Sequence, residues 1–276
     1  MASNSIIPVA SLDDPRVVPY VNLKERELAR EGGRFIAEGE FVVRRLLESR
    51  YAVESLLLAE HRVAEMVPLA PAGVPVYFAP ATIVNRIVGF KFHSGVMAVG
   101  LRGQPVTLAE AAAHWANRPL TLVVLPEISN TENMGALIRI SAAFGVDAVI
   151  LGKRTCDPFY RQSIRVSMGA IFSLPLVRSA SLLDDLRALH DVHGVELFAT
   201  VLSPDAERLS ATRRCHRMGI LFGNEAQGLS AEHIAACSRR ITIPMLLGTD
   251  SLNVAVSAGI VLFHFTQGGG AIPQQG

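Results

Sequence analysis

Two apolar runs of strand length flank a helix-like stretch in the middle of this chain. The runs are residues 120–125 and 148–151, and apolar residues recur with helical spacing over residues 134–144 between them. Asn133 suits the N-cap of this helix, because its side-chain oxygen can accept from a first-turn N–H, and Gly145 suits the C′ position, where φ is usually positive. A helix that joins two strands in this way forms a βαβ unit, whose strands run parallel. The sequence therefore predicts an α/β fold built on a parallel sheet.

Three segments place polar or turn-forming residues directly after an apolar strand-like run. They are residues 133–139 after the run 120–125, residues 223–230 after the run 218–222, and residues 243–253, which begin at the end of the run 241–243. Open α/β sheets gather their binding groups at the carboxyl ends of their strands. We therefore expect the three segments to form parts of one site.

The second segment is one residue away from a P-loop. It has the pattern G-x-x-x-x-G-L-S, in which Leu229 stands where a P-loop has the lysine that reaches the β- and γ-phosphates. Nucleotide hydrolysis is therefore disfavoured. Gly223 and Gly228 carry no Cβ and would let the backbone beside Glu225 approach a ligand closely, although a loop that needs glycine only for its shape is the alternative.

The polar residues of the other two segments have alternative interpretations. Ser251 or Asn253 would ordinarily be a helix cap, because both residue types are favoured there. Arg139 lies within an otherwise apolar stretch of helix, where it could snorkel to solvent or direct its guanidinium at a phosphate or ribose.

Taken in order, the three segments resemble the three motifs of the SpoU (TrmH) family of RNA 2′-O-ribose methyltransferases in the SPOUT superfamily. The resemblance covers about residues 121–265 and includes the spacing between the second and third motifs. It implies a C-terminal parallel-sheet domain with a deep trefoil knot that binds S-adenosylmethionine in a bent form. Real knots are too rare to be inferred from composition or periodicity, so the knot follows from the resemblance alone.

The resemblance also assigns roles to individual residues. It implies that Asn133 and Arg139 meet the RNA ribose, and that Glu225, Ser251 and Asn253 order the reacting centre. The residues implied to contact the methyl donor are Thr200, Gly223, Asn224, Ile243, Met245 and Leu252.

The chemistry of methyl transfer fits these residue types. The donor is a sulfonium with an activated methyl group, so an enzyme mainly has to hold the attacking oxygen in line, and no metal is required. A ribose hydroxyl needs a positioned acceptor for its proton. The family account gives this role to the arginine, but a guanidinium normally stays protonated. Whether Arg139 acts as the base or as a phosphate-anchored orienter therefore stays open.

The N-terminal part of the chain predicts a separate small α/β domain. Strands are expected at residues 35–39, 53–59 and 74–78, and helices within 22–34 and at 41–47, 61–66 and 81–88. Residues 34–43 resemble the small substrate-binding domain, similar to ribosomal protein L30e, that precedes many SpoU domains. We expect an L30e-like domain at residues 1–102, a linker at 103–118 with a helix at 108–115, the methyltransferase domain at 119–267 and a disordered tail at 268–276.

Basic residues suggest a path for RNA, although the formal net charge of the 276 residues is only +1. Lys153, Arg154, Arg161 and Arg165 lie close together in the sequence, with only Asp157 opposing them, and Arg34 lies in the N-terminal domain. We expect these five residues to contact RNA. A second basic cluster is formed by Arg208, Arg213, Arg214, His216 and Arg217. A solvated helix face is the alternative interpretation of either cluster.

Composition indicates an enzyme of the cytoplasm. Half of the residues are hydrophobic, and the three cysteines show no metal-ligand spacing, which favours a reducing compartment and no structural zinc. No secretion signal and no membrane span are expected. Residues 254–265 form a helix that is apolar nearly all round, so it must be covered by the chain's own sheet or by a second copy. The family resemblance implies a homodimer through the C-terminal domain.

These observations predict an S-adenosylmethionine-dependent RNA 2′-O-ribose methyltransferase. The added N-terminal domain favours 23S ribosomal RNA as the substrate, by analogy at the level of the fold, and transfer RNA is the nearest rival. A non-catalytic RNA-binding protein that retains the fold is a third alternative. The complete set of polar site residues argues against it, because a retired site has no physical need for them.

Overall fold

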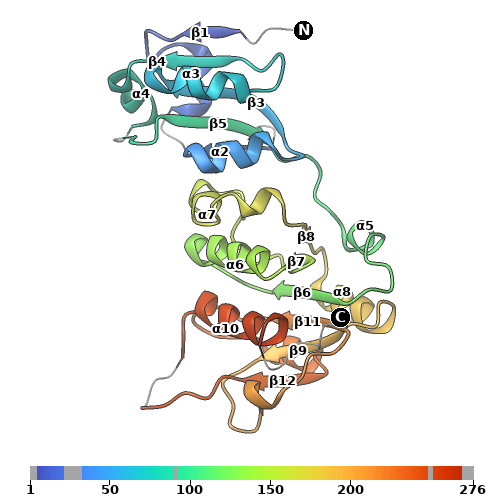
Figure 1. Cartoon of the computed structure of the whole chain (residues 1–276). Coiled ribbons are helices and arrows are strands. Elements are labelled where there is room, and N and C mark those ends of the chain that lie inside the picture. Colours follow the sequence, from blue (N-terminus) through green and yellow to red (C-terminus); the bar gives the residue numbers. More distant parts are fainter. Residues whose placement is uncertain (1–4, 22–32, 90–91, 248–250, 269–276) are drawn as a thin grey trace. The chain divides into compact units, whose positions relative to one another are not determined.

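The computed structural model describes residues 5–21, 33–89, 92–247 and 251–268 of the chain (Figure 1). The helix predicted within residues 22–34 and the tail predicted at residues 268–276 fall almost entirely outside these ranges. The chain divides into two compact units. One unit comprises Met1–Gln104 and Pro158–Ser173, and the other comprises Pro105–Asp157 and Leu174–Gly276.

The first unit is built on a mixed sheet of five strands in the order β1-β4-β3-β5-β2. The outer strand β2 and the central strand β3 run antiparallel to β5, whereas β1 and β3 run parallel to β4. The strands are β1 (Ile6–Pro8), β2 (Arg34–Glu38), β3 (Ala52–Ala59), β4 (Val76–Ala79) and β5 (Val96–Leu101). The described part of the first 104 residues also contains the helices α2 (Glu40–Leu47), α3 (Val63–Met66) and α4 (Ala81–Val88), with short 3-10 turns at Pro15–Tyr20, Glu60–Arg62 and Val67–Leu69. The strands predicted at 35–39, 53–59 and 74–78 and the helices predicted at 41–47, 61–66 and 81–88 are confirmed to within about two residues, the usual uncertainty of element ends.

A segment from the middle of the sequence completes the first unit. It contains α7 (Arg161–Val166) and a 3-10 turn at Ala170–Phe172. The ring of Phe172 stacks on Phe35 at a centroid distance of 5.6 Å, and the ring of Phe159 lies 5.1 Å from Phe35. The Arg161 guanidinium pairs with Glu38 at 2.8 Å. The domain boundaries predicted from the sequence placed residues 158–173 in the methyltransferase domain at 119–267. In the structure, their aromatic and ionic contacts place them in the first unit.

We expect Phe172→Ala to destabilise the first unit by about 3 kcal/mol, because truncation of a buried phenylalanine usually costs 3–5 kcal/mol. The side chain is 4% exposed and packs against Phe35. Urea unfolding followed by circular dichroism measures the free energy of unfolding. The matched control is Phe41→Ala, whose side chain is 68% exposed and should matter little. Equal stabilities for the two variants would contradict the packing described above.

The second unit contains a seven-stranded sheet in the order β10-β12-β9-β11-β6-β7-β8, and all neighbouring strands are parallel. This confirms the predicted parallel sheet. The strands are β6 (Leu120–Leu125), β7 (Ala148–Leu151), β8 (Leu176–Arg178), β9 (Glu196–Thr200), β10 (Glu207–Arg208), β11 (Arg217–Leu221) and β12 (Arg239–Thr242).

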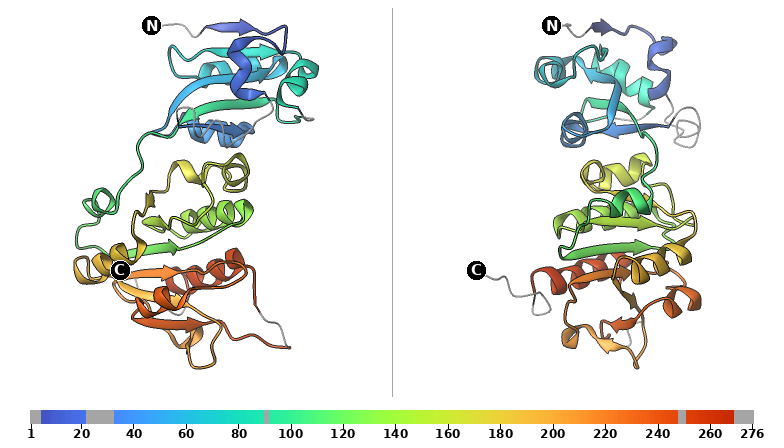
Figure 2. Two further views of the ribbon diagram at one scale, coloured as in Figure 1. Left: turned by 180° about the vertical axis from the view of Figure 1, so that it is seen from behind. Right: turned by 90° about the vertical axis from the view of Figure 1, so that its right-hand side faces the viewer.

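Helices cover both faces of this sheet (Figure 2). On one face, α5 (Leu108–Ala112) and α8 (Leu182–Asp191) pack on a core that includes Leu122, Ile150 and Leu197. On the other face, α6 (Thr131–Ala143) and α10 (Val254–Thr266) lie side by side. The short helix α9 (Ala231–Ala235) precedes β12.

The helix predicted at residues 108–115 is shorter than predicted, and it packs on the core of the second unit. It ends at Ala112, and Thr107 and Glu110 form a capping box at its start. Leu108 and Trp115 belong to the core of the second unit, where they are 9% and 3% exposed. This part of the predicted linker is therefore a packed element of the second unit.

Candidate active site

A cavity of about 670 Å³ lies in the second unit, where the three segments that follow strands β6, β11 and β12 meet. Its lining includes all six residues predicted to contact the donor and four of the five residues predicted to be catalytic. They are Thr200, Gly223, Asn224, Ile243, Met245 and Leu252, together with Asn133, Glu225, Ser251 and Asn253. The three segments thus line one cavity, whereas Arg139 is not part of its lining.

Helix α6 begins earlier than predicted, which gives Asn133 a different role. The N-cap is Asn130, whose Oδ1 accepts from the N–H groups of Glu132 at 2.7 Å and Asn133 at 3.1 Å. The prediction of Asn133 as the cap was wrong, because the polar run before it also suits the start of a helix. Gly145 has the expected positive φ, 67°. Since Asn130 performs the capping, the Asn133 side chain is available for other contacts.

Asn133 connects the second and third segments. Its Nδ2 donates to Glu225 Oε1 at 3.0 Å, and its Oδ1 accepts from Asn253 Nδ2 at 2.9 Å. The three residues are separated by up to 120 positions in the sequence. Because each amide end of Asn133 has a defined partner, its orientation is fixed, and the three loops are held together by side-chain hydrogen bonds.

Both carboxylate oxygens of Glu225 accept two hydrogen bonds each. Oε1 accepts from Asn133 Nδ2 and from the Asn130 N–H at 3.1 Å, and Oε2 accepts from the N–H and hydroxyl of Ser129 at 3.3 and 3.2 Å. Burial raises the pKa of Glu225, but the hydrogen bonds from Asn133 and from backbone N–H groups outweigh it, so the pKa lies below its ordinary value. Glu225 is therefore a carboxylate at neutral pH.

The third segment ends at the start of α10. Asn253 is the N-cap of this helix, and its Oδ1 accepts from the Ala255 N–H at 2.8 Å while its Nδ2 reaches Asn133. The capping interpretation of Asn253 is thus confirmed, and the same side chain also belongs to the candidate site. Ser251 lines the cavity near this cap.

Gly223 is required by the shape of its own loop. The backbone of Asn224 and Gly228 forms two hydrogen bonds, of 2.9 and 3.0 Å, that close the loop. A Cβ on Gly223 would lie 2.3 Å from the carbonyl carbon of Gly228 and 2.5 Å from the Leu229 nitrogen. Gly228 itself has a φ of 69°, which favours glycine. The alternative of glycine for loop shape is therefore supported at both positions.

We expect Gly223→Ala to weaken donor binding about tenfold, because overpacking against backbone usually costs about 1–3 kcal/mol and would displace the loop that lines the cavity. Calorimetric titration with S-adenosylmethionine measures this affinity. Gly259→Ala, in the middle of α10, is the control, because a Cβ there meets nothing within 4 Å apart from the neighbouring residues and backbone of its own helix. An unchanged affinity of Gly223→Ala would show that the loop tolerates a side chain.

Two of the predicted donor-binding side chains are partly used within the protein. The Thr200 hydroxyl donates to the Leu221 carbonyl oxygen at 2.8 Å. Asn224 Oδ1 accepts from the N–H groups of Ala226 and Gln227, at 2.9 and 3.2 Å. These contacts hold both side chains in place at the cavity, and they use only the oxygen of the Asn224 amide.

Arg139 lies outside the cavity lining. It occupies the exposed side of α6, six residues after Asn133, and within the described part of the chain its guanidinium makes no hydrogen bond or ion pair. Six residues correspond to about 9 Å along a helix and to a different helix face. The side chain is therefore a solvent-facing cation near, but not in, the cavity of this chain.

Several residues predicted to contact RNA are held by acids that are distant in the sequence. Arg34 pairs with Glu54 at 2.7 Å, and Arg154 pairs with Glu127 at 3.0 Å. Arg161 pairs with Glu38, as described above. Counting only Asp157 as an opposing acid was therefore wrong, because folding brings further carboxylates to the cluster. Lys153 and Arg165 are exposed.

The second basic cluster is also partly used for structure. Arg217 Nη1 donates to the Ala116 carbonyl oxygen at 2.6 Å, and the His216 ring lies 3.3 Å from the Asn117 carbonyl oxygen. Burial lowers the pKa of Arg214. These residues precede or begin β11, at the amino end of a strand whose carboxyl end faces the cavity.

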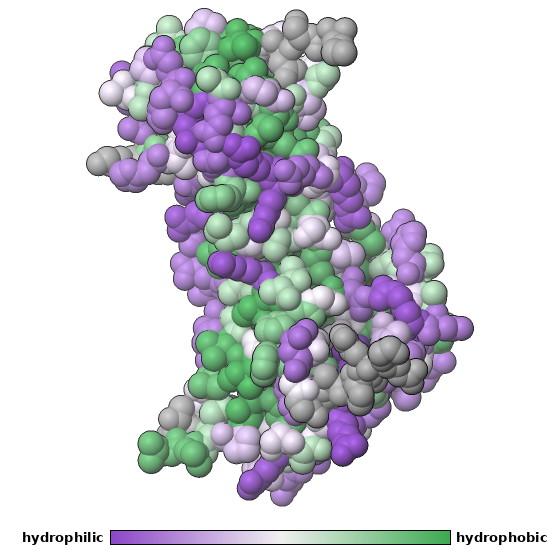
Figure 3. All heavy atoms as spheres, viewed as in Figure 1, coloured by the Kyte–Doolittle hydropathy of each residue, from purple (hydrophilic) through white to green (hydrophobic). Residues whose placement is uncertain are grey.

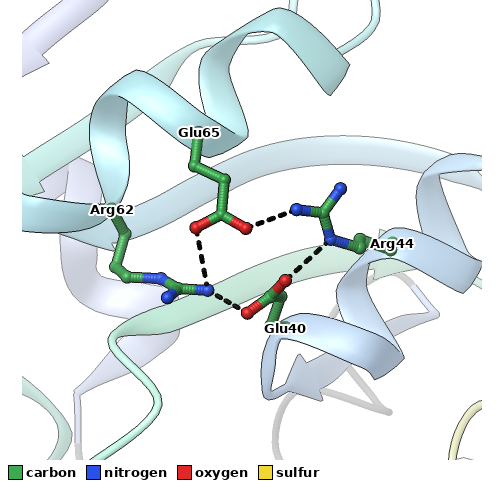
Figure 4. Close-up of polar contacts among 4 residues, drawn as sticks. All are labelled: Glu40, Arg44, Arg62 and Glu65. Atoms are coloured by element: carbon green, nitrogen blue, oxygen red, sulfur yellow. Dashed lines mark hydrogen bonds and ion pairs between the residues drawn. The ribbon is translucent and has the colours of Figure 1, made fainter.

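A closed ring of charges lies on the first unit (Figure 4). Arg44 pairs with Glu40 at 2.9 Å and with Glu65 at 2.5 Å, while Arg62 pairs with Glu65 at 3.2 Å and also with Glu40. Two cations and two anions compensate one another. This surface therefore stabilises the contact of α2 with α3 and is not a positively charged RNA footprint.

The parallel sheet and the cavity beside its strands are typical of an α/β enzyme that binds a small molecule, and comparison with known proteins gives the family. Residues 120–263 match the SpoU rRNA Methylase family, and the chain belongs to this family. An uncharacterized tRNA/rRNA methyltransferase of Mycobacterium bovis is 34% identical over 269 residues, which cover 95% of this chain and 92% of the relative. The 23S rRNA (guanosine(2553)-2′-O)-methyltransferase RlmP of Bacillus subtilis is 25% identical, with 93% of this chain and 98% of the relative covered.

Solved structures show the same fold. The AdoMet-bound rRNA methyltransferase of Sinorhizobium meliloti superposes with a TM-score of 0.80 at 25% identity, covering 94% of this chain and 96% of the other. The SpoU methyltransferase AviRb of Streptomyces viridochromogenes gives a TM-score of 0.76 at 22% identity, covering 91% and 95% of the two chains. Within the described residues, every helix is too short or too polar to cross a membrane.

Proposed function

We propose that this chain transfers the methyl group of S-adenosylmethionine to the 2′-oxygen of a ribose in structured RNA, and that the RNA is 23S ribosomal RNA. The observation that carries the proposal is the hydrogen-bonded set of Asn133, Glu225 and Asn253 in the lining of a cavity at the carboxyl ends of the strands. The three residues are those that the family resemblance places at the reacting centre.

The cavity fits the donor. Its volume lies in the range of about 300–1,000 Å³ that is usual for sites of small molecules. Apolar side chains of Phe222, Ile243 and Leu252 alternate in its lining with backbone and amide groups that can bind adenine and ribose. The ionised Glu225 adds a negative charge, which suits a sulfonium. When bound, S-adenosylmethionine supplies a methyl group that is already activated for transfer.

Glu225 is best suited to position other groups. A carboxylate offers about four acceptor sites, and Ser129, Asn130 and Asn133 provide four donors to Glu225. The carboxylate therefore has no free acceptor for the proton of a ribose hydroxyl. Its role would be to hold Asn133, which in turn orients the ribose together with Ser251. Arg139 would supply the base or the phosphate contact.

The preference for 23S ribosomal RNA is supported by the activity named for the Bacillus subtilis relative. Transfer RNA is the alternative, since the Mycobacterium bovis relative is named for both kinds of RNA. The first unit would bind structured RNA as an L30e-like domain, with Lys153 and Arg165 as further contacts. We also propose that the second unit contains the trefoil knot that the family resemblance implies, and that the protein acts in the cytoplasm.

The test combines two measurements on one preparation. Calorimetry first measures binding of S-adenosylmethionine, and labelled methyl transfer is then measured on total RNA from cells that lack the enzyme. Label in a ribose at one site of 23S rRNA confirms the proposal. Label in a tRNA would show that tRNA, and not 23S rRNA, is the substrate. No donor binding would favour a non-catalytic RNA-binding protein. Binding without transfer calls for the same assay on ribosomal assembly intermediates.

The exposed side of α10 supports the proposed homodimer. Val256, Ile260 and Phe263 recur at helical spacing and are 51%, 39% and 55% exposed, while Ala258, Val261 and Leu262 on the other side are buried. Apolar atoms gather over α10 on the face shown in Figure 3. The chain's own sheet therefore covers only one side of this helix, and a second copy would cover the other.

We expect the double substitution Val256→Glu and Phe263→Glu to convert a dimer to a monomer, because two charges would be buried without partners in an apolar interface. Sedimentation equilibrium measures the mass. Phe41→Glu changes a phenylalanine of the first unit that is 68% exposed, and it should leave the mass unchanged. A wild-type chain that sediments as a monomer would remove the dimer from the proposal.

A further inference from the structure

Arg240 is the one cationic residue in the described lining of the cavity, and Glu225 is the one anionic residue. Glu225 already accepts four hydrogen bonds from within the protein. Arg240 lies on β12, and its residue is exposed. Among the described residues, no carboxylate lies within ion-pair distance of its guanidinium. The cavity thus contains a cation without a protein counter-ion.

The neighbouring residue Arg239 forms the ion pairs with the nearby glutamates, so Arg240 has no carboxylate partner among the described residues. Arg239 pairs with Glu207 at 2.5 Å and with Glu196 at 3.6 Å, and its guanidinium lies 4.9 Å from the centre of the Phe198 ring. Successive residues of a strand point to opposite faces of the sheet. The acids of β9 and β10 therefore pair with Arg239 on one face of the sheet. Arg240 points to the other face, as Thr242 does, and both residues line the cavity.

Arg240 also lies apart from the reacting centre along the strand. It precedes Ile243 by three residues, which corresponds to roughly 10 Å in a β-strand. Asn133 and Asn253 are hydrogen-bonded to each other at the start of α10 and also line the cavity. A ligand that fills the cavity can therefore place one end at the reacting centre and another end at Arg240.

We infer that Arg240 binds the α-carboxylate of the methionine part of the donor. An unpaired guanidinium in the lining of a cavity attracts an anionic group of the ligand, and the hydrogen bonds between them are charge-assisted. The carboxylate is the only anionic group of S-adenosylmethionine, and a guanidinium can bind it through two parallel hydrogen bonds. This inference rests on the proposed function, since it concerns the same donor.

The test compares two ligands that differ only in this carboxylate. S-adenosylhomocysteine and its decarboxylated analogue are titrated by calorimetry into the wild type, into Arg240→Gln, and into the control Arg208→Gln. Arg208 is an exposed arginine of the adjacent strand β10 and is not part of the cavity lining. Circular dichroism verifies that all three proteins are folded.

We expect Arg240→Gln to weaken binding of S-adenosylhomocysteine about tenfold, the low end for a hydrogen bond to a charged group, and to leave the decarboxylated analogue unaffected. Arg208→Gln should change neither affinity. Equal weakening for both ligands would overturn the inference and assign Arg240 to the adenosine part. Unchanged affinities with reduced RNA binding would assign it to a phosphate of RNA. If the wild type binds neither ligand, it is the proposed donor site that fails.

Discussion

Replacing Arg139 by alanine should lower methyl transfer by about a thousandfold, the upper part of the range for removing one preorganised charged or hydrogen-bonding group from a reaction centre. Donor affinity should stay the same, because Arg139 is not part of the cavity lining. The fold should also persist, because the side chain is exposed on α6. Single-turnover methyl transfer and calorimetry measure the two effects separately. Arg187→Ala, on the exposed surface of α8, is the matched control.

The lysine variant separates the two roles left open for Arg139. If the residue is the base, Arg139→Lys should show activity that rises with pH towards the lysine pKa of about 10.4, because only the neutral amine can accept a proton. If it orients the ribose through a phosphate, Arg139→Lys should keep partial activity without this rise, since lysine keeps the charge but loses the planar fork. Full activity of Arg139→Ala would remove the residue from the mechanism.

Asn133→Asp should have the second largest effect, a loss of about a hundredfold in methyl transfer at pH 7.5. The substitution keeps the size of the side chain but places a carboxylate oxygen where Nδ2 now donates to Glu225 at 3.0 Å. Two carboxylates at this distance repel, and the pKa of one of them is raised. The orientation that Asn133 gives to the reacting centre is then lost.

The lowered pKa of Glu225 predicts in which direction the activity of Asn133→Asp changes with pH. In the wild type the pKa of Glu225 lies below its ordinary value, so its hydrogen-bonded set is stable above that value and is lost only as the pH falls through the lowered pKa. In the Asn133→Asp variant, one proton bound between the two carboxylates restores a donor. The activity of the variant relative to wild type should therefore rise as the pH is lowered from 8 to 6.

Asn130→Asp is the control for added charge. Aspartate caps a helix as well as asparagine does, and the contact of residue 130 with Glu225 is made by its backbone N–H. This variant adds a negative charge near Glu225 but keeps every hydrogen bond, so only a small loss is expected. Equal losses in the two variants would show that charge, and not the bond from Asn133, governs the effect.

Local signals in the sequence predicted much of the second unit. The strands at 120–125 and 148–151, the parallel pairing between them and the cap at Asn253 each depend on a few neighbouring residues, and all are confirmed. The start of α6 was misplaced by three residues, because Asn130 and Asn133 both suit an N-cap and only tertiary contacts decide between them. The Asn133 side chain is drawn to Glu225 and Asn253, which are 92 and 120 residues away.

Contacts between distant segments account for the other differences. Glu38 and Glu127 neutralise arginines that looked unopposed, since a count of neighbouring charges cannot include acids that folding brings near. Arg240 was not singled out, because two adjacent arginines differ only in the sheet face to which they point. The alternation of side chains along residues 239–242 is a signal that could have separated them.

The composition of the first unit has a practical consequence for recombining such proteins. Because Pro158–Ser173 belongs to this unit, the chain passes between the units three times, at residues 104/105, 157/158 and 173/174. A chimaera cut once near residue 104 would leave Phe35 without the rings of Phe159 and Phe172. A chimaera that transfers the first unit therefore has to take both the first 104 residues and Pro158–Ser173 from the same parent protein. The same contacts require the two segments to change together during evolution.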